Sequence, residues 1–265
     1  MSIIPCIFDQ DSYDTPQERR RDLLTRMFFN ARLNCHLRIW VNFYGVGKNA
    51  KNGKLNRVQQ IRFSENNVRI LERCGAKIHL RGLENLSAEP GPFVLAGNHM
   101  SSVESLLLNS IITPRLEFTY VIKNNTFSVP FLRQAMMAMD AIGVDRANPK
   151  EDFKVVMSEG AARLSKGCSV LIFPEGGRHA QFLPERFNSI AVKLALKAGV
   201  KLIPFALKTD FIERGKLIAD FGAINPKNEI YFEFGSPIEV VGNGRDAQQQ
   251  VIEFIVQHTS RRSSR

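Results

Sequence analysis

From Ala76 onward, short apolar runs alternate with longer segments whose apolar residues recur every three or four positions. Apolar runs of four to eight residues bounded by Gly or Pro predict buried strands, and the longer periodic segments predict helices. Six strands are predicted, at 76–82, 92–97, 116–122, 169–174, 201–207 and 229–235. Helices are predicted at 102–112, 151–165, 189–198 and 246–258. The alternation favours an α/β fold with a mixed, largely parallel sheet flanked by helices.

The chain before Ala76 has helical periodicity after an irregular start of fourteen residues. Thr15 is suited to cap a helix, Pro16 to its first position and Glu18 to a capping box with Thr15. The apolar positions that recur at helical spacing are Leu24, Met27, Phe28, Ala31 and Cys35, together with Leu33, Leu37, Trp40, Val41 and Tyr44. They predict an amphipathic N-terminal helix that continues to Gly47.

A Gly/Asn/Lys-rich segment at 45–54 is the best candidate for a linker and a domain boundary. A second helix is predicted at 56–73, with Gly75 as its stop signal. We therefore divide the chain into an N-terminal tail with a membrane-associating helical segment, 1–54, and an α/β domain, 55–265.

Two interpretations of the N-terminal helix remain open. Arginines interrupt its apolar residues, and its longest uncharged piece, 39–47, is too short to span a bilayer. Either the helix packs on the α/β domain, or it lies in a membrane interface with its arginines at the headgroups and Trp40 inserted.

The net charge of +10 on 265 residues indicates an anionic partner, and both nucleic acid and an acidic membrane surface satisfy that requirement. The chain has no RNA-recognition aromatic signature and no zinc-finger spacing, so we do not expect a nucleic-acid partner. The four cysteines form no C-x-x-C pair, which fits a reducing compartment. We expect no metal, since H-E-x-x-H is absent, and no cleavable signal peptide.

Polar side chains that could take part in catalysis or binding follow three of the apolar segments. His99 and Glu104 lie in "NHMSSVES", Arg146 lies in "AIGVDRANP", and Glu175 and Arg178 lie in "FPEGGRH". Loops that leave the carboxyl ends of strands are where α/β sheets carry their chemistry. "SSVE" is also a capping box, so Glu104 either closes the first turn of a helix or orients the histidine.

The four blocks "NHMSSVE", "IGVDR", "FPEGGR" and "LIPF", in this order, resemble those of the glycerophospholipid acyltransferases, particularly the bacterial 1-acyl-glycerol-3-phosphate acyltransferases. The resemblance covers roughly residues 82–238. It implies transfer of a fatty acyl group from acyl-CoA or acyl carrier protein to the free hydroxyl of lysophosphatidic acid, giving phosphatidic acid. No cofactor is implied beyond the acyl donor. The implied location is the cytoplasmic face of the inner membrane, held peripherally or monotopically.

By position, the resemblance makes His99 the general base and Glu104 its orienting carboxylate. A carboxylate fixes the imidazole tautomer, and the other ring nitrogen takes a proton from the attacking hydroxyl. Direct attack on the thioester fits the absence of a G-x-S-x-G nucleophile elbow and of a cysteine near the histidine.

The same resemblance makes Arg146, Glu175, Gly176 and Arg178 substrate-binding residues. Arginine offers a bidentate fork to phosphate, whereas a carboxylate accepts from a glycerol hydroxyl or braces an arginine. Amides of the "FPEGG" loop are candidates for oxyanion stabilisation. The Met/Phe-rich stretch 126–139 either lines an acyl groove or belongs to the ordinary core.

Three positions depart from the commoner pattern of these enzymes. Glu104 stands where aspartate is commoner, and Gly177 where threonine is commoner. Asn188 occupies the place of a frequent lysine, with Lys193 five residues further on. The missing cation leaves open an acceptor other than lysophosphatidic acid, and a non-catalytic basic lipid-binding protein is the second alternative.

Overall fold

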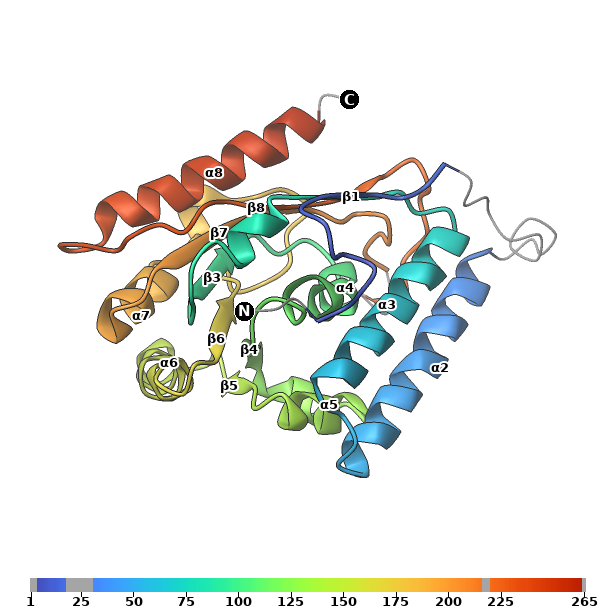
Figure 1. The fold of residues 1–265 in the computed structure, drawn as a ribbon, viewed down its shortest axis with the longest axis horizontal. Coiled ribbons are helices and arrows are strands. Elements are labelled where there is room, and N and C mark those ends of the chain that lie inside the picture. The colour runs from blue at the N-terminus through green and yellow to red at the C-terminus, as the bar shows by residue number, and fades with distance from the viewer. Residues whose placement is uncertain (1–3, 18–30, 216–219, 264–265) are drawn as a thin grey trace.

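The computed structural model describes residues 4–17, 31–215 and 220–263. Its eight strands form one sheet in the order β1-β2-β8-β7-β3-β6-β4-β5 (Figure 1). The strands are β1 (Tyr13–Asp14), β2 (Ile78–Arg81), β3 (Val94–Gly97), β4 (Phe118–Lys123), β5 (Ile142–Val144), β6 (Ser169–Ile172), β7 (Leu202–Lys208) and β8 (Ile230–Phe234). Only β1–β2 and β7–β8 are antiparallel. The predicted mixed, largely parallel α/β sheet is confirmed.

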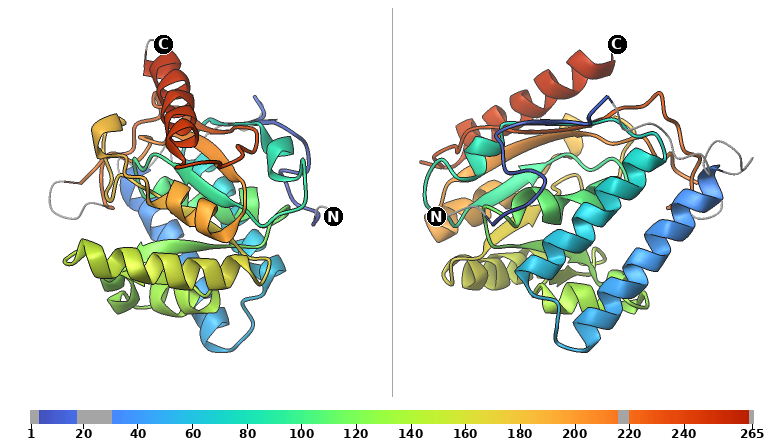
Figure 2. Two further views of the ribbon diagram at one scale, coloured as in Figure 1. Left: turned by 90° about the vertical axis from the view of Figure 1, so that its left-hand side faces the viewer. Right: turned by 45° about the vertical axis from the view of Figure 1, so that its right-hand side comes forward.

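Helices cover both faces of the sheet (Figure 2). The described α-helices are α2 (Ala31–Lys51), α3 (Arg57–Arg73), α4 (Val103–Ile112), α5 (Leu132–Ala138), α6 (Pro149–Leu164), α7 (Ile190–Ala198) and α8 (Arg245–Ser263). One core joins the sheet to α2, α3 and α4, and a second joins it to α6, α7 and α8. The six predicted strands and the five helices predicted after the N-terminal one are all present, whereas β1, β5 and α5 are too short to give a periodic signal.

Local signals account for several helix ends. The side chain of Asn56 caps α3 by accepting from the amide of Gln59 at 3.0 Å. Asn148 caps α6, and Pro149 occupies its first turn. Gly199 ends α7 in the left-handed region at φ 64°. These boundaries are set by residues that the sequence displays directly.

The linker predicted at 45–54 is wrong over most of its length, because α2 continues to Lys51. The glycines that suggested a break serve close packing instead. A Cβ on Gly47 would lie 2.4 Å from the Cβ of Phe131, and one on Gly45 would lie 3.0 Å from the Phe63 ring. These glycines let the second half of α2 approach its neighbours, a demand that local sequence does not reveal.

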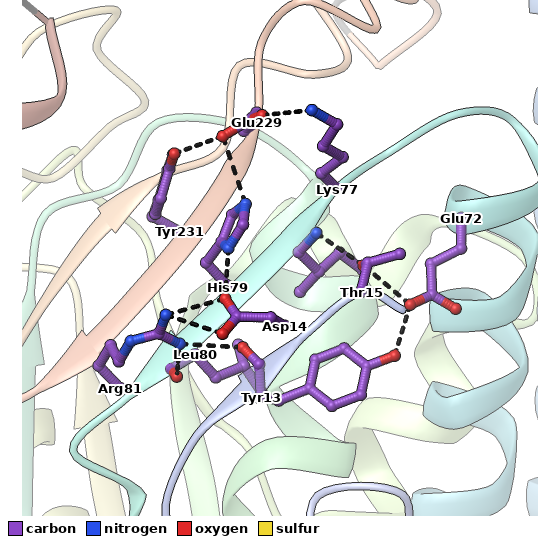
Figure 3. A network of polar contacts seen from close by, with 11 residues as sticks. Tyr13, Asp14, Thr15, Glu72, Lys77, His79, Leu80, Arg81, Glu229 and Tyr231 are labelled. Atoms are coloured by element: carbon purple, nitrogen blue, oxygen red, sulfur yellow. Dashed lines mark hydrogen bonds and ion pairs between the residues drawn. The ribbon is translucent and has the colours of Figure 1, made fainter. Parts of the chain in front are cut away.

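Thr15 does not pair in the way a helix cap requires. Its hydroxyl donates to the Glu72 carboxylate at 2.9 Å and accepts from the amide of Ile78 at 2.9 Å, so it extends the contact of β1 with β2 (Figure 3). Pro16 and Gln17 are described but not helical, so the predicted start at Pro16 is wrong; the part from Glu18 to residue 30 lies outside the described residues.

A polar network joins β1, β2 and β8 at this edge of the sheet (Figure 3). His79 stands between Asp14 at 2.5 Å and Glu229 at 3.3 Å, and Arg81 donates to Asp14 at 2.8 Å. Burial would raise the pKa of Asp14, but its contacts with Arg81 and His79 outweigh that effect and hold it below its ordinary value. The paired charges fix the short strand β1 on the sheet.

The face of α2 that points away from the core is apolar. Leu33, Leu37, Trp40, Val41 and Tyr44 are 45–64% exposed, while Cys35 and Ile39 on the opposite side are buried. The helix therefore packs on the domain, as the first interpretation requires, and also presents an outward apolar surface, which we call the α2 outer face. In the described part of the chain, no helix has the length and hydrophobicity to cross a bilayer.

Candidate active site

His99 follows the central strand β3 and is held by its neighbours. A Cβ on Gly97 would lie 2.3 Å from the Phe205 ring, so only glycine permits this approach of β3 to β7. The Asn98 side chain exchanges two hydrogen bonds with the backbone of Leu207, at 2.9 and 2.8 Å. The His99 ring stacks on Phe173 with 4.1 Å between centroids. Packing and backbone bonds thus fix the imidazole at the carboxyl end of the sheet.

Glu104 lies behind His99 in the first turn of α4 and is fully buried. Its Oε2 is 3.4 Å from Nδ1 of His99, an ion-pair distance that is longer than a good hydrogen bond. Its Oε1 accepts from the amides of Met100 at 2.9 Å and Ser101 at 2.8 Å and from the Thr209 hydroxyl. The carboxylate is therefore fixed mainly by backbone and hydroxyl donors.

The contacts of Glu104 bear on both sequence interpretations, and its role in orienting the histidine stays a prediction. Its bond to the Ser101 amide is one half of a capping box. The other half is absent, because the Ser101 hydroxyl accepts from the amide of Val103 at 3.1 Å and donates to the carbonyl of Thr209 at 2.7 Å. The same helix turn that satisfies these amides aims the carboxylate at the imidazole.

The environment keeps Glu104 ionised. Burial would raise the pKa of its carboxyl, but the contact with His99 and the bonds from Thr209 and Ser101 outweigh burial and lower it. An ionised carboxylate beside Nδ1 favours the tautomer with the proton on Nδ1. Nε2 is then the ring nitrogen that can accept a proton.

Glu175 joins the loops after β3 and β6. It is 8% exposed, and its carboxylate accepts from the amides of His99 at 2.9 Å and Leu183 at 3.2 Å. Burial raises the pKa of Glu175, and the two amide bonds offset part of that effect. Its contacts are with backbone rather than an arginine, so it holds His99 in place; substrate contact by this residue stays a prediction.

The two predicted arginines lie at the ends of the adjoining loops. Arg146 adopts φ 62°, and its guanidinium donates to the carbonyl of Gly176, which itself has φ 70°. Asp152 accepts from the Arg146 amide at 2.7 Å and holds this loop. Arg178 pairs with Asp220. Each arginine thus has a protein partner that a substrate anion would have to share or displace.

A cavity of about 1420 Å³ connects these residues. His99, Arg146, Gly176 and Arg178 line it, whereas Glu104 and Glu175 lie behind its wall. Its apolar part runs between α2, α3 and α5, and part of the Met/Phe-rich stretch lines it, namely Thr126, Val129, Pro130, Leu132, Ala135, Met136 and Met139. Four of the six predicted site residues therefore share one cavity.

Sequence reasoning missed the residues that support this arrangement. Thr209, just beyond the end of β7, donates to Glu104, Phe173 stacks on His99, and Asn98 ties β3 to β7. Thr209 follows the "LIPFAL" block, so the strand-end rule that found the other loops applies to it too. In the described part of the chain, no cluster of three His, Cys, Asp or Glu side chains is placed to hold a metal ion.

Comparison with known proteins adds an independent observation. Residues 77–208 match the family model described as Acyltransferase. The chain is 33% identical over 133 residues to a 1-acyl-sn-glycerol-3-phosphate acyltransferase of Pseudomonas aeruginosa, covering 50% of each protein. It is 31% identical over 131 residues to a chloroplastic enzyme of the same name from Arabidopsis thaliana, covering 49% of this chain and 36% of that one. The chain thus spans half or less of the length of these relatives.

A solved structure resembles the whole arrangement. The crystal structure of the 1-acyl-sn-glycerophosphate acyltransferase PlsC from Thermotoga maritima superimposes with a TM-score of 0.66 at 16% identity, covering 89% of this chain and 95% of that one. At this identity the similarity concerns the fold.

Proposed function

This chain belongs to the acyltransferase family through residues 77–208, and from that premise we propose that it transfers a fatty acyl group to the free hydroxyl of 1-acyl-glycerol-3-phosphate. The donor is acyl-CoA or acyl carrier protein, and the product is phosphatidic acid. The proposal rests on one observation. A histidine that contacts a buried carboxylate lines a large, partly apolar cavity, and two arginines line the same cavity.

The proposed reaction needs no covalent intermediate on the protein. Nε2 of His99 takes the proton of the acceptor hydroxyl as its oxygen attacks the thioester carbonyl. Glu104 remains ionised and stabilises the imidazolium that forms. When the tetrahedral adduct collapses, the carbon–sulfur bond breaks and the imidazolium returns its proton to the leaving thiolate.

The substrate orientation follows from the polarity of the cavity. Arg146 and Arg178 suit the acceptor phosphate, because guanidinium groups form charge-assisted bonds to phosphate oxygens. The apolar part beneath α2, α3 and α5 suits the acyl chains. The buried carboxylate of Glu175 braces the loop that carries His99.

The test is turnover by the purified protein with one acyl-CoA and a panel of acceptors. We expect release of free CoA thiol with lysophosphatidic acid and formation of phosphatidic acid. Turnover only with another lysophospholipid would show that this lipid, and not lysophosphatidic acid, is the acceptor. Binding of lipid without any turnover would favour a non-catalytic lipid-binding protein.

Replacing Arg178 with alanine is expected to raise the KM for lysophosphatidic acid by about tenfold or more, because a hydrogen-bonded charge pair is lost. The KM for acyl-CoA should change little. Steady-state kinetics with each substrate varied in turn measures both constants. A similar rise for both substrates would instead indicate a structural role for the pair with Asp220.

We propose further that the α2 outer face lies in an anionic membrane surface, at the cytoplasmic side of the inner membrane. Contiguous exposed apolar side chains mark interaction surfaces. An acyl acceptor with a long chain resides in a bilayer, and the net charge of +10 attracts anionic lipid. The α2 outer face flanks the apolar part of the cavity, which would give lipid a short route inward.

The double variant Leu37→Asp, Val41→Asp is expected to weaken vesicle binding at least tenfold, since it removes two inserted apolar side chains and adds charge in their place. Neither residue lines the cavity. Co-sedimentation with vesicles containing anionic phospholipid measures the effect. Val241→Asp is the matched control, because Val241 is 64% exposed, as Val41 is. Equal losses in both proteins would refute docking through α2.

A further inference from the structure

Asn188 is uncharged, and its side chain is held by contacts within the protein, so it does not replace a cation at this position. Its side-chain amide donates to the carbonyl of Pro174, and its Oδ1 accepts from the amide of Ile190 at 3.0 Å. The residue thus ties the start of α7 to the loop that begins with Phe173. The cation missing at this position has to come from elsewhere if the cavity holds an anion here.

Lys193 lines the same cavity as Asn188, Arg146 and Arg178. It is five residues beyond Asn188 and is the fourth residue of α7. Its ammonium group lies 5.5 Å from the centre of the Phe153 ring, on the neighbouring helix α6. The aromatic ring places the lysine head at the cavity without neutralising its charge.

Lys193 differs from the two arginines in its polar partners. In the described ranges, no carboxylate lies within ion-pair distance of it, whereas Arg178 pairs with Asp220 and Arg146 donates to the Gly176 carbonyl. Lys193 also lies in the first turn and a half of α7, where the helix macrodipole disfavours a cation. The helix dipole therefore does not stabilise this cation, whereas an anion in the cavity would.

We infer that Lys193 binds the phosphate monoester of the acyl acceptor, in place of the cation absent at position 188. This inference rests on the proposed acyl transfer. The acceptor phosphate is one carbon away from the carbon bearing the attacking hydroxyl, so it has to lie near the histidine. The phosphates of CoA are separated from the thioester by the whole pantetheine arm.

The connection to the reaction centre is short. His99 stacks on Phe173, the next residue is Pro174, and Asn188 binds the Pro174 carbonyl at the start of the helix that carries Lys193. At neutral pH a phosphate monoester carries a charge of about −1.5 to −2, which two partnered arginines satisfy less well than three cations. Lys193 is thus a specificity residue for a phosphorylated acceptor.

The experiment compares Lys193→Met with Lys193→Arg and with the control Lys197→Met. Methionine keeps an unbranched stem over Phe153 while removing the charge. Lys197 is one turn further along α7 and does not line the cavity. Each protein is assayed with lysophosphatidic acid and with monoacylglycerol, at several concentrations of acceptor and of acyl-CoA. Thermal unfolding establishes that each variant is folded.

For Lys193→Met we expect a KM for lysophosphatidic acid that is higher by about ten- to one-hundred-fold, with little change for acyl-CoA or monoacylglycerol. Arginine should recover much of the loss, and Lys197→Met should behave as the wild type. A rise in the KM for acyl-CoA alone would show that Lys193 binds the donor. Equal effects of Lys193→Met and Lys197→Met would show that Lys193 acts only through the surface charge of the protein. Either result overturns the inference. Absence of turnover in the wild-type protein would refute the proposed function itself.

Discussion

Replacing His99 with alanine is expected to lower kcat/KM for acyl transfer by about 10²- to 10⁴-fold, the usual contribution of a positioned general base. His99 lines the cavity with its side chain 14% exposed, and Glu104 faces its Nδ1. No cysteine lines the cavity in the part of the chain that the structure describes, so no thiol is placed to substitute as nucleophile. The free thiol released from acyl-CoA, measured with and without lysophosphatidic acid, gives the rate.

The control for this substitution is His179→Ala. His179 lies in the loop after β6, and its backbone amide donates to the carbonyl of His99, in the loop after β3, at 2.9 Å. The side chain of His179 does not line the cavity. We expect near-normal kcat for this variant. If the His99→Ala protein, with an unchanged unfolding temperature, turned over as fast as the wild type, the general-base mechanism would be wrong.

The sequence was sufficient to predict six of the eight strands and the placement of the site loops. Buried strands such as β3 and β6 are continuous apolar runs, and their polar followers, "NH" and "PEGG", mark the carboxyl edge of the sheet. The pair His99 and Glu104 was predictable because both belong to one strand–loop–helix unit. Local patterns carry this information, since both residues are close in the chain.

Contacts between residues that are distant in the chain could not be predicted from the sequence. Thr209 reaches Glu104 across 105 positions, because β7 lies beside β3 in the sheet. Glu175 was predicted to bind a substrate hydroxyl or an arginine. The hydrogen bonds that it accepts come from two backbone amides, and no side-chain pattern in the sequence indicates such partners. Gly47 was predicted to belong to a linker, but it lies within α2, where the absence of a side chain allows close packing against Phe131. In each case the deciding partner is distant in the chain or belongs to the backbone.

Replacing Glu104 with glutamine is expected to lower kcat by about 10²- to 10⁴-fold, although the side chain keeps its size. Glu104 accepts from two amides and the Thr209 hydroxyl while facing Nδ1 of His99. Glutamine has one acceptor oxygen, which those donors would take, so its NH₂ group would face the imidazole. That arrangement favours the tautomer with the proton on Nε2, which cannot then accept one from the substrate hydroxyl.

The pH dependence of stability offers a second measurement on the same variant. The folded-state pKa of Glu104 lies below its ordinary value, so the carboxylate stabilises the protein above the unfolded-state pKa of about 4.3 and loses this contribution as the pH falls through the folded-state value. The wild type should therefore be more stable than Glu104→Gln at pH 7, and the difference should shrink below about pH 4. Thr209→Val, which removes one donor but keeps the carboxylate, should lower kcat far less. A Glu104→Gln protein with wild-type kcat would show that Glu104 only caps α4, and the orienting role would have to be abandoned.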